Sequence, residues 1–137
     1  MPTLNAVPIR APFVDWILEG HKTWEIRSRS TKIRGQIGLI KSKSLTVVGT
    51  CEIIDVIGPL TRKLIRENAQ SKMNEPPEEC SDCVGQYAWV LANVRRLDVP
   101  MPYKHPSGAV TWVKLDEATA AKVLAAATKS AARRGGR

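Results

Sequence analysis

Residues 12–29, PFVDWILEGHKTWEIRSR, hold the local signals that decide how the chain begins to fold. Phe13, Trp16 and Ile17 stand at positions i, i+3 and i+4, a spacing that predicts a short helix with one apolar face. Gly20 follows them and suits the left-handed conformation that commonly ends a helix. The stretch therefore predicts a short helix with an abrupt stop.

Alternation replaces the helical spacing directly after this stop. Trp24 and Ile26 face one side of a predicted strand and Glu25 and Arg27 face the other, because successive side chains of a strand alternate. Lys22 lies at the turn between the helix and the strand. The polar side is either an ordinary solvated surface or a set of groups that converge on a cleft. In a cleft, partial burial would make Lys22 a better base.

Six strands and three short helices are predicted along the chain. The expected strands cover residues 4–10, 22–29, 34–40, 45–58, 87–97 and 109–115, and the expected helices cover 12–20, 60–70 and 117–128. Thr61 and Asp116 are predicted to cap the second and third helices. Residues 71–86 and 98–108 are predicted to be loops, because they combine prolines with polar residues and show no period.

The order of these elements predicts an α+β, mainly β fold. Strands do not alternate with helices, which argues against a doubly wound parallel sheet. Gly35, Gly38 and Gly49 lie inside predicted strands and indicate bulges or tight bends. We therefore expect a small mixed β-barrel of about six strands with flanking short helices.

The length and composition favour one domain. A chain of 137 residues with 43% hydrophobic residues is long enough for one real core and too short for two ordinary ones. Residues 1–128 are assigned to this domain, and the basic residues 129–137 to a disordered tail. No stretch is apolar enough to span a membrane, and the N-terminus lacks a signal-peptide pattern. The default expectation is a cytoplasmic protein without membrane association; a protein partner is not specified.

The formal net charge of +8 is unevenly distributed. Residues 1–66 carry eleven Lys and Arg against five Asp and Glu, whereas residues 67–128 carry six against eight. The segment 27–43 contains no acidic residue, and such a local field attracts polyanions. An alternative is that the charge only keeps the protein soluble. The residues expected to contact a nucleic-acid backbone are Arg29, Lys32, Arg34, Lys41 and Lys43.

Three cysteines occur in the chain, and two of them, Cys80 and Cys83, have C-x-x-C spacing. This spacing is compatible with zinc, which needs two further ligands. Cys51, His21 and His105 are the candidates, and they form no second spaced pair. Free cysteines in a loop are the favoured interpretation, and we expect neither a metal nor another cofactor.

The octapeptide GHKTWEIR (residues 20–27) matches the pattern G-x-K-x-x-E-x-R. With it, the chain resembles the ASCH family, the activating signal cointegrator homology domains of the PUA-like superfamily, in its small stand-alone form. Residues 8–40 resemble the N-terminal region of the domain, residues 47–56 its central strand and residues 87–115 its C-terminal part. The similarity extends over residues 5–115.

The resemblance implies a small PUA-like β-barrel with helices around a cleft that the signature residues line. It also implies RNA as the usual partner, modified nucleobases as ligands of some members, and hydrolysis of RNA or of acetylated cytidine by others. The amidohydrolase type uses a lysine, a threonine and a glutamate. Lys22 matches the lysine, and Glu25 holds the place of the threonine. Thr23 lies on the neighbouring face, and Glu52 is a candidate for the distal glutamate.

Aromatic side chains add candidates for base stacking. Tyr103 and His105 lie in a proline-bounded segment, and flat rings offer stacking faces to nucleobases. Trp89 is a further candidate, although a core position is favoured for it, as for the other three tryptophans. The expected ligand-binding residues are Arg10, Lys22, Glu25, Arg27, Tyr103 and His105.

Two classes of function stay open at this point. The first is binding of RNA or of a nucleotide or nucleoside, modified or not, through a basic cleft. The alternative is a hydrolase in which Lys22 and Glu25 are catalytic, acting on RNA as a ribonuclease or on an acylated nucleoside as an amidohydrolase. A protein–protein adaptor ranks last, because the sequence shows no exposed apolar patch.

Overall fold

The computed structural model describes residues 3–109 and 111–135 of the chain. The elements in chain order are β1 (Leu4–Ile9), α1 (Phe13–Leu18), β2 (Trp24–Arg27), β3 (Gly35–Lys41), β4 (Thr46–Ile57), α2 (Arg62–Met73), the 3-10 helix η1 (Pro77–Cys83), β5 (Tyr87–Pro102), β6 (Val113–Leu115) and α3 (Glu117–Gly135). Six strands and three α-helices in this part of the chain confirm the predicted mainly β class.

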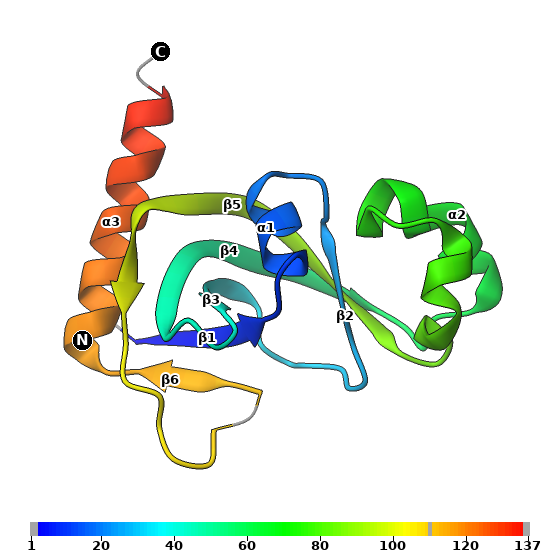
Figure 1. Cartoon of the computed structure of the whole chain (residues 1–137), viewed down its shortest axis with the longest axis horizontal. Coiled ribbons are helices and arrows are strands. Elements are labelled where there is room, and N and C mark those ends of the chain that lie inside the picture. The colour runs from blue at the N-terminus through cyan, green and yellow to red at the C-terminus, as the bar shows by residue number, and fades with distance from the viewer. Residues whose placement is uncertain (1–2, 110, 136–137) are drawn as a thin grey trace.

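The six strands form one mixed sheet in the order β2-β5-β4-β3-β1-β6. β1 and β3 are parallel, and the other neighbouring strands are antiparallel. β4 and β5 are the longest strands and run between α3 at one end of the molecule and α2 at the other (Figure 1). Within the described residues no ladder joins β2 to β1 or β6, so the expected barrel is left open along one seam.

Irregular pairing bends the sheet. The register shifts once between β3 and β4 and three times between β4 and β5, and such bulges increase the local bend and twist. Gly49 lies at one of these shifts, as the sequence predicts. A Cβ on Gly49 would lie 2.6 Å from the carbonyl oxygen of Arg95 and 2.6 Å from Cδ2 of Leu18. Glycine is therefore required here by the close approach of β5 and α1.

Three apolar clusters attach the helices to the sheet. α1 packs in a cluster with Trp89, α2 packs in a second with Trp24, and α3 packs on β1 and β6 in a third. Trp24 and Trp89 are buried, as predicted, whereas Trp16 and Trp112 are half-buried. The indole of Trp112 stacks on that of Trp89 with ring centroids 5.4 Å apart.

Both predicted helix caps are confirmed. The hydroxyl of Thr61 accepts a hydrogen bond from the backbone N–H of Leu64 at 3.2 Å. The carboxylate of Asp116 accepts one from the N–H of Thr119 at 2.7 Å, and this bond lowers the pKa of Asp116. Each cap supplies an acceptor for one of the N–H groups that the first turn of a helix leaves unpaired.

The C-terminal helix is longer than the sequence predicts. α3 continues through Gly135, so residues 129–135 are helical rather than part of a disordered tail, and residues 136–137 lie outside the described part of the chain. Ser130 is buried, and its hydroxyl donates a hydrogen bond to the carbonyl oxygen of Arg96 on β5 at 2.8 Å. This tertiary contact anchors a segment whose composition alone favours disorder.

Two predicted loops also contain regular structure. β5 extends beyond residue 97 to Pro102, because Met101 and Pro102 pair with the start of β4. Within residues 71–86, α2 extends to Met73 and η1 covers Pro77–Cys83. Local composition did not reveal these segments, since their order depends on neighbours distant in sequence.

The close approach at Gly49 yields a stability prediction. Gly49→Ala is expected to lower the free energy of unfolding by about 1–3 kcal/mol, because the new methyl group overlaps backbone as well as a side chain. Urea denaturation measures the change. Gln36→Ala, at an exposed site on β3, is the control and is expected to stay within about 0.5 kcal/mol. Equal stability of the two variants would contradict the packing argument.

Candidate functional site

The seam of the sheet is bridged by the side chain of Arg27. On β2, its Nε donates to Oε2 of Glu25 at 2.9 Å, and its Nη2 donates to the carbonyl oxygen of Pro8 on β1 at 2.8 Å. The guanidinium also lies over the Trp89 ring, 5.6 Å from the centroid. Arg27 therefore connects two strands that no backbone ladder joins in the described chain.

Lys22 is positioned by the turn that ends α1. The N–H of Gly20 donates to the carbonyl oxygen of Ile17 and that of Lys22 to the carbonyl oxygen of Trp16, with Gly20 at φ +85°. A Cβ at Gly20 would meet no atom within 4 Å, so the left-handed backbone rather than space favours glycine here. The stop predicted from the sequence is thus confirmed, and it directs Lys22 inward.

Backbone hydrogen bonds of Thr23 connect the same turn to two other elements. Its N–H donates to the carbonyl oxygen of Lys72 in α2 at 2.8 Å, and its carbonyl oxygen accepts from the N–H of Leu91 in β5 at 2.8 Å. These bonds bring the start of β2 close to the end of α2. The backbone therefore places Lys22 and Glu25 beside the segment that follows α2.

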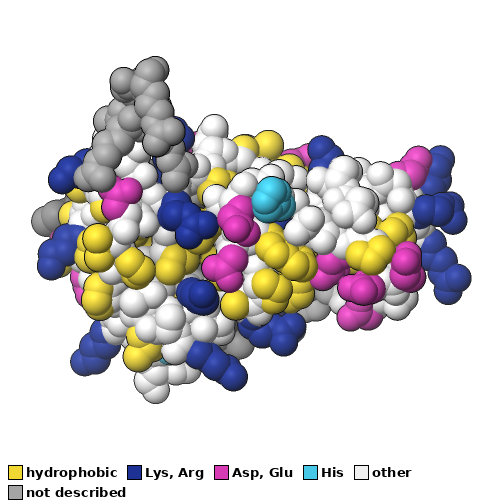
Figure 2. Space-filling model, turned by 45° about the horizontal axis from the view of Figure 1, so that its top comes forward, with side chains coloured by type: hydrophobic (Ala, Val, Ile, Leu, Met, Phe, Trp, Pro, Cys, Tyr) yellow, Lys and Arg dark blue, Asp and Glu magenta, His cyan; other side chains and the backbone are white. Residues whose placement is uncertain are grey.

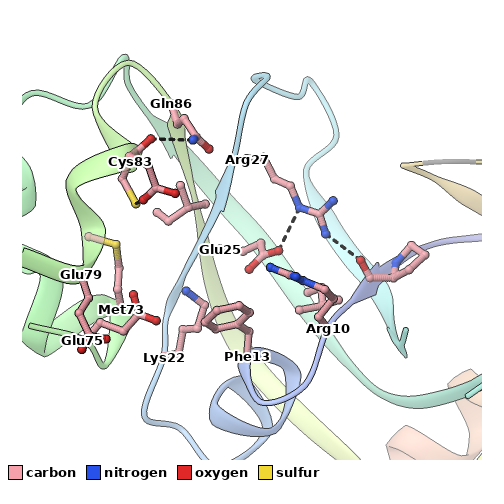
Figure 3. A pocket seen from close by; sticks show the side chains of 14 residues that line it. Arg10, Phe13, Lys22, Glu25, Arg27, Met73, Glu75, Glu79, Cys83 and Gln86 are labelled. Carbon is pink, nitrogen blue, oxygen red and sulfur yellow. Dashed lines mark hydrogen bonds and ion pairs between the residues drawn. The ribbon is translucent and has the colours of Figure 1, made fainter. Parts of the chain in front are cut away.

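A cavity of about 400 Å³ opens where these elements meet. Figure 3 shows Lys22 and Phe13 between Glu75 and Glu79 on one side and Arg10 on the other. The residues that line the cavity are Pro8, Ile9, Arg10, Phe13, Lys22, Glu25, Ile26, Arg27, Met73, Glu75, Glu79, Asp82, Cys83 and Gln86.

The lining carries both signs of charge. Arg10, Lys22 and Arg27 come from the N-terminal segment, together with Glu25. The segment after α2 contributes three further carboxylates, Glu75, Glu79 and Asp82. The expectation of a simply basic cleft is therefore wrong: the cavity has one predominantly basic wall and one acidic wall, because residues 71–86 fold over its edge.

Lys22 and Glu25 are the charged side chains most deeply buried here, with 5% and 7% exposure. Burial lowers the pKa of Lys22, and the nearby carboxylates of Glu25 and Glu75 oppose this shift only in part. The ammonium group lies over the ring of Phe13, with Nζ 5.4 Å from the centroid. A buried amine with a lowered pKa has the properties of a general base.

Two of the predicted ligand-binding residues lie elsewhere. The hydroxyl of Tyr103 is hydrogen-bonded to Nδ1 of His105 at 2.9 Å, and Nε2 of His105 to the carbonyl oxygen of Ala109 at 2.9 Å. Tyr103 packs against the cluster of α3, and neither residue is part of the cavity lining. The structure thus does not bring these two rings to the cavity; they stabilise the loop after β5.

The five residues expected to contact a nucleic-acid backbone do not line the cavity either. Arg29, Lys32 and Arg34 are exposed in the segment between β2 and β3. Nζ of Lys41 lies 3.5 Å from Oδ1 of Asp15, and Lys43 is in the turn before β4. Figure 2 shows Lys and Arg side chains scattered over one face of the molecule, with Asp and Glu side chains between them, rather than one basic stripe.

The other candidates for an amidohydrolase site are also apart from the cavity. Glu52 accepts a hydrogen bond from the side-chain amide of Asn93 and, like Thr23, is not among the cavity residues. Within the described chain there is no group of three or more His, Cys, Asp or Glu residues arranged to hold a metal. Cys80 and Cys83 are both free cysteines in this structure.

The sequence did not indicate the acidic wall. Met73, Glu75, Glu79, Asp82, Cys83 and Gln86 all line the cavity and all come from one segment without hydrophobic periodicity. The density of carboxylates in that segment was the available signal. It could not be interpreted without knowing that Thr23 and Lys72 bring the segment against β2.

The comparisons with known proteins bear on this architecture. The model of the ASCH domain matches residues 7–101, which is more than half of the chain. The chain belongs to the ASCH family. A comparison with curated proteins gave no match.

Solved structures support the same fold for this ASCH chain. The crystal structure of ASCH from Zymomonas mobilis has a TM-score of 0.68 at 14% identity, covering 88% of this chain and 93% of that chain. A mutant form of the same protein has a TM-score of 0.68 at 14% identity, covering 91% of this chain and 98% of that chain. Identity this low establishes similarity of fold alone.

A separate finding concerns the helices. Among the described residues, no helix is both long and apolar enough to cross a bilayer.

The burial of Lys22 yields a prediction on stability. Because its pKa is lowered on folding, the folded protein binds fewer protons than the unfolded chain between the folded pKa and the unfolded value of about 10.4. The free energy of unfolding therefore rises with pH across that window. Lys22→Met is expected to equal or exceed the parent in stability near neutral pH. Its advantage should shrink as the pH approaches the pKa of free lysine.

Urea denaturation at neutral and alkaline pH tests this expectation. The control is Lys63→Met, an exposed lysine of α2 whose replacement should change stability by less than about 0.5 kcal/mol at either pH. A loss of more than about 1 kcal/mol in Lys22→Met near neutral pH would mean that the buried ammonium group stabilises the fold.

Proposed function

We propose that the cavity binds one nucleotide or nucleoside unit, modified or not, either free or as part of an RNA. The observation that carries this proposal is the convergence of Arg10, Lys22, Glu25 and Arg27 on one cavity of about 400 Å³. Small-molecule sites in proteins commonly have volumes of about 300–1,000 Å³ and contain convergent polar groups that fix the ligand's orientation. Membership of the ASCH family agrees with such a ligand.

The two walls suit the two ends of a nucleotide. Arg27 uses Nε and Nη2 for Glu25 and Pro8 in the described structure, which leaves Nη1 to bind an anionic group together with Arg10. The carboxylates of Glu75 and Glu79 accept hydrogen bonds, as the amino groups of a nucleobase require. The cavity therefore favours a ligand with an anionic end and an end rich in donors.

An RNA ligand would extend beyond the cavity. Arg29 lies two residues after Arg27, and with Lys32 and Arg34 it forms an exposed basic segment suited to phosphates. In this proposal Lys41 and Lys43 continue the same contact. Such contacts position the chain of nucleotides, whereas the cavity selects the unit that enters it.

RNA titrations at several salt concentrations test the binding proposal. The logarithm of affinity is expected to fall with the logarithm of salt concentration by about 0.7 for each phosphate contact on a single strand. Arg29→Ala should reduce this slope by about one contact, and Lys22→Ala or Arg10→Ala should weaken binding about tenfold or more, since a charge-assisted hydrogen bond contributes about 1.5–3 kcal/mol.

The matched control for these titrations is Lys122→Ala, on α3 at the opposite end of the molecule from α2. It should bind as the parent does. Affinity independent of salt, or unchanged binding in Lys22→Ala, would count against the proposal.

The burial and lowered pKa of Lys22 favour a second candidate, a hydrolase. A neutral Lys22 amine would take a proton from a water or from a ribose hydroxyl that attacks the substrate. Glu25, buried beside it, would carry that proton onward, and Nη1 of Arg27 would stabilise the developing negative charge. The substrate would be RNA or an acylated nucleoside.

Turnover assays on RNA and on acylated nucleosides test this second candidate. Lys22→Ala and Glu25→Gln are each expected to lower kcat at least about 100-fold, as for loss of a general acid or base. Each variant is purified in parallel with the parent, so that a contaminating nuclease would give equal activity in all preparations. No turnover by the parent on either substrate class would reject the hydrolase and leave the binding proposal unaffected.

A further inference from the structure

Cys80 and Cys83 lie one turn apart in η1. Two short turns meet at Cys80, which has φ −109° and ψ 21°, and the second turn runs from Cys80 to Cys83. In a 3-10 turn the side chains at i and i+3 lie above one another, and a rise of about 2.0 Å per residue separates their Cα atoms by about 6 Å. Disulfides span Cα separations of about 4.4–6.8 Å, so this turn places the two cysteines in range.

The two thiols share one environment. Cys80 belongs to the apolar cluster of α2, and Cys83 packs against that cluster. The thiol of Cys80 donates to Glu75 and that of Cys83 to Asp82, and each thiol affects the pKa of the other, so the two side chains are neighbours. Neither forms a disulfide in this structure. The pair therefore needs little movement of the backbone to become covalently linked.

The two cysteines differ in how they are reached. Cys83 is half-buried and lines the ligand cavity, where Figure 3 shows it on the same side as Met73 and Glu79. Cys80 is 1% exposed and borders a second hollow of about 370 Å³ between α2 and η1. Cys51 is fully buried in β4. An oxidant that enters the cavity therefore meets Cys83 first.

We propose that Cys80 and Cys83 form a reversible intramolecular disulfide that regulates the ligand cavity. The formation of the disulfide stands on the geometry of η1 alone. Its regulatory effect rests on the function proposed above for the cavity.

Hydrogen peroxide serves as the oxidant in a balanced scheme. The sulfur of Cys83 attacks one peroxide oxygen, the O–O bond breaks, and the thiol proton leaves with the other oxygen as water, which gives a sulfenic acid. The sulfur of Cys80 then attacks the sulfur of Cys83, the S–O bond breaks, and a second water leaves. Two thiols and one peroxide thus yield one disulfide and two waters. A dithiol reductant reverses the change by disulfide exchange.

Burial raises the pKa of Cys80 to about 12, assisted by its hydrogen bond to Glu75, and burial also raises the pKa of Cys83. Asp82 adds to the shift of Cys83, and the charge of Lys22 opposes it. Because the thiolate is the reacting species, oxidation should be slow near neutral pH. Thiols that ionise poorly are also poor leaving groups, so the disulfide, once formed, should resist reduction.

The link to the cavity runs through Glu75. The thiol of Cys80 donates a hydrogen bond to Oε2 of Glu75 at 3.2 Å, and Glu75 is one of the carboxylates that act on Lys22. A disulfide has no S–H, so oxidation removes this donor from Glu75. The released carboxylate then interacts more strongly with the ammonium form of Lys22. Oxidation therefore increases the protonated fraction of the lysine.

The experiment treats the full-length protein with hydrogen peroxide, and separately with oxidised glutathione. Peptide mapping without reductant is expected to show a Cys80–Cys83 linkage in a monomer that has lost two hydrogen atoms. Labelling of Lys22 by an amine acylating reagent is then compared in the oxidised and reduced protein. Because only the neutral amine reacts, a larger protonated fraction of Lys22 in the oxidised protein is expected to lower labelling about threefold, and dithiothreitol should restore it.

Three variants control the chemistry. Cys51→Ala should oxidise as the parent does. Cys80→Ser keeps a hydroxyl donor for Glu75 and should accumulate oxidised Cys83 without a linkage, with Lys22 labelling unchanged by peroxide. Cys83→Ser should show little oxidation, because the two remaining thiols, those of Cys51 and Cys80, are buried.

The outcomes separate this proposal from the function of the cavity. Linkage to Cys51, a disulfide between two molecules, or oxygen addition without linkage would overturn it. A Cys80–Cys83 disulfide that leaves Lys22 labelling unchanged would overturn the regulatory part. Neither readout requires RNA. If the parent binds RNA, affinity that is equal in the oxidised and reduced forms also rejects regulation and leaves the binding function intact.

Discussion

The side chain of Arg27 joins two strands that the backbone leaves unpaired. Its guanidinium reaches the carbonyl oxygen of Pro8 on β1 and the carboxylate of Glu25 on β2, while it lies over the ring of Trp89. A ladder at this point would lack a donor, because proline has no N–H. One side chain therefore closes the seam in place of a row of backbone hydrogen bonds. The space left beside it is the cavity.

This arrangement buries charge close to the closing interaction. Lys22 and Glu25 are nearly inaccessible to solvent, and burial of a charged group is unfavourable unless partners compensate for it. For Glu25 the partner is Arg27. For Lys22 the compensation is incomplete, as its lowered pKa indicates. The least favourable electrostatic position in the site is thus held by Lys22, and perturbed pKa values of this kind occur most often at functional sites.

Local signals account for the part of the fold and site that could be predicted. Helical spacing and Gly20 predicted α1 and its end, and alternation predicted β2; Arg10, one of the residues expected to bind a ligand, lines the cavity. The signals failed where order comes from distant contacts. β5 continues because its end pairs with β4, and the end of α3 is anchored by the hydrogen bond from Ser130 to the carbonyl oxygen of Arg96 on β5. Tyr103 and His105 were misplaced because a proline-rich loop does not specify where its rings point.

By itself, the sequence determined the mainly β class, the turn that carries Lys22, and the alternation that separates Glu25 and Arg27 from Trp24. These features depend on the sterics of a few consecutive residues, which the amino-acid types alone control. Only the tertiary structure decided that the cavity has an acidic wall and that Cys83 borders it. The reason is physical: the N–H of Thr23 donates to the carbonyl oxygen of Lys72 near the end of α2. The segment that follows α2 therefore lies beside residues about fifty positions earlier in the chain.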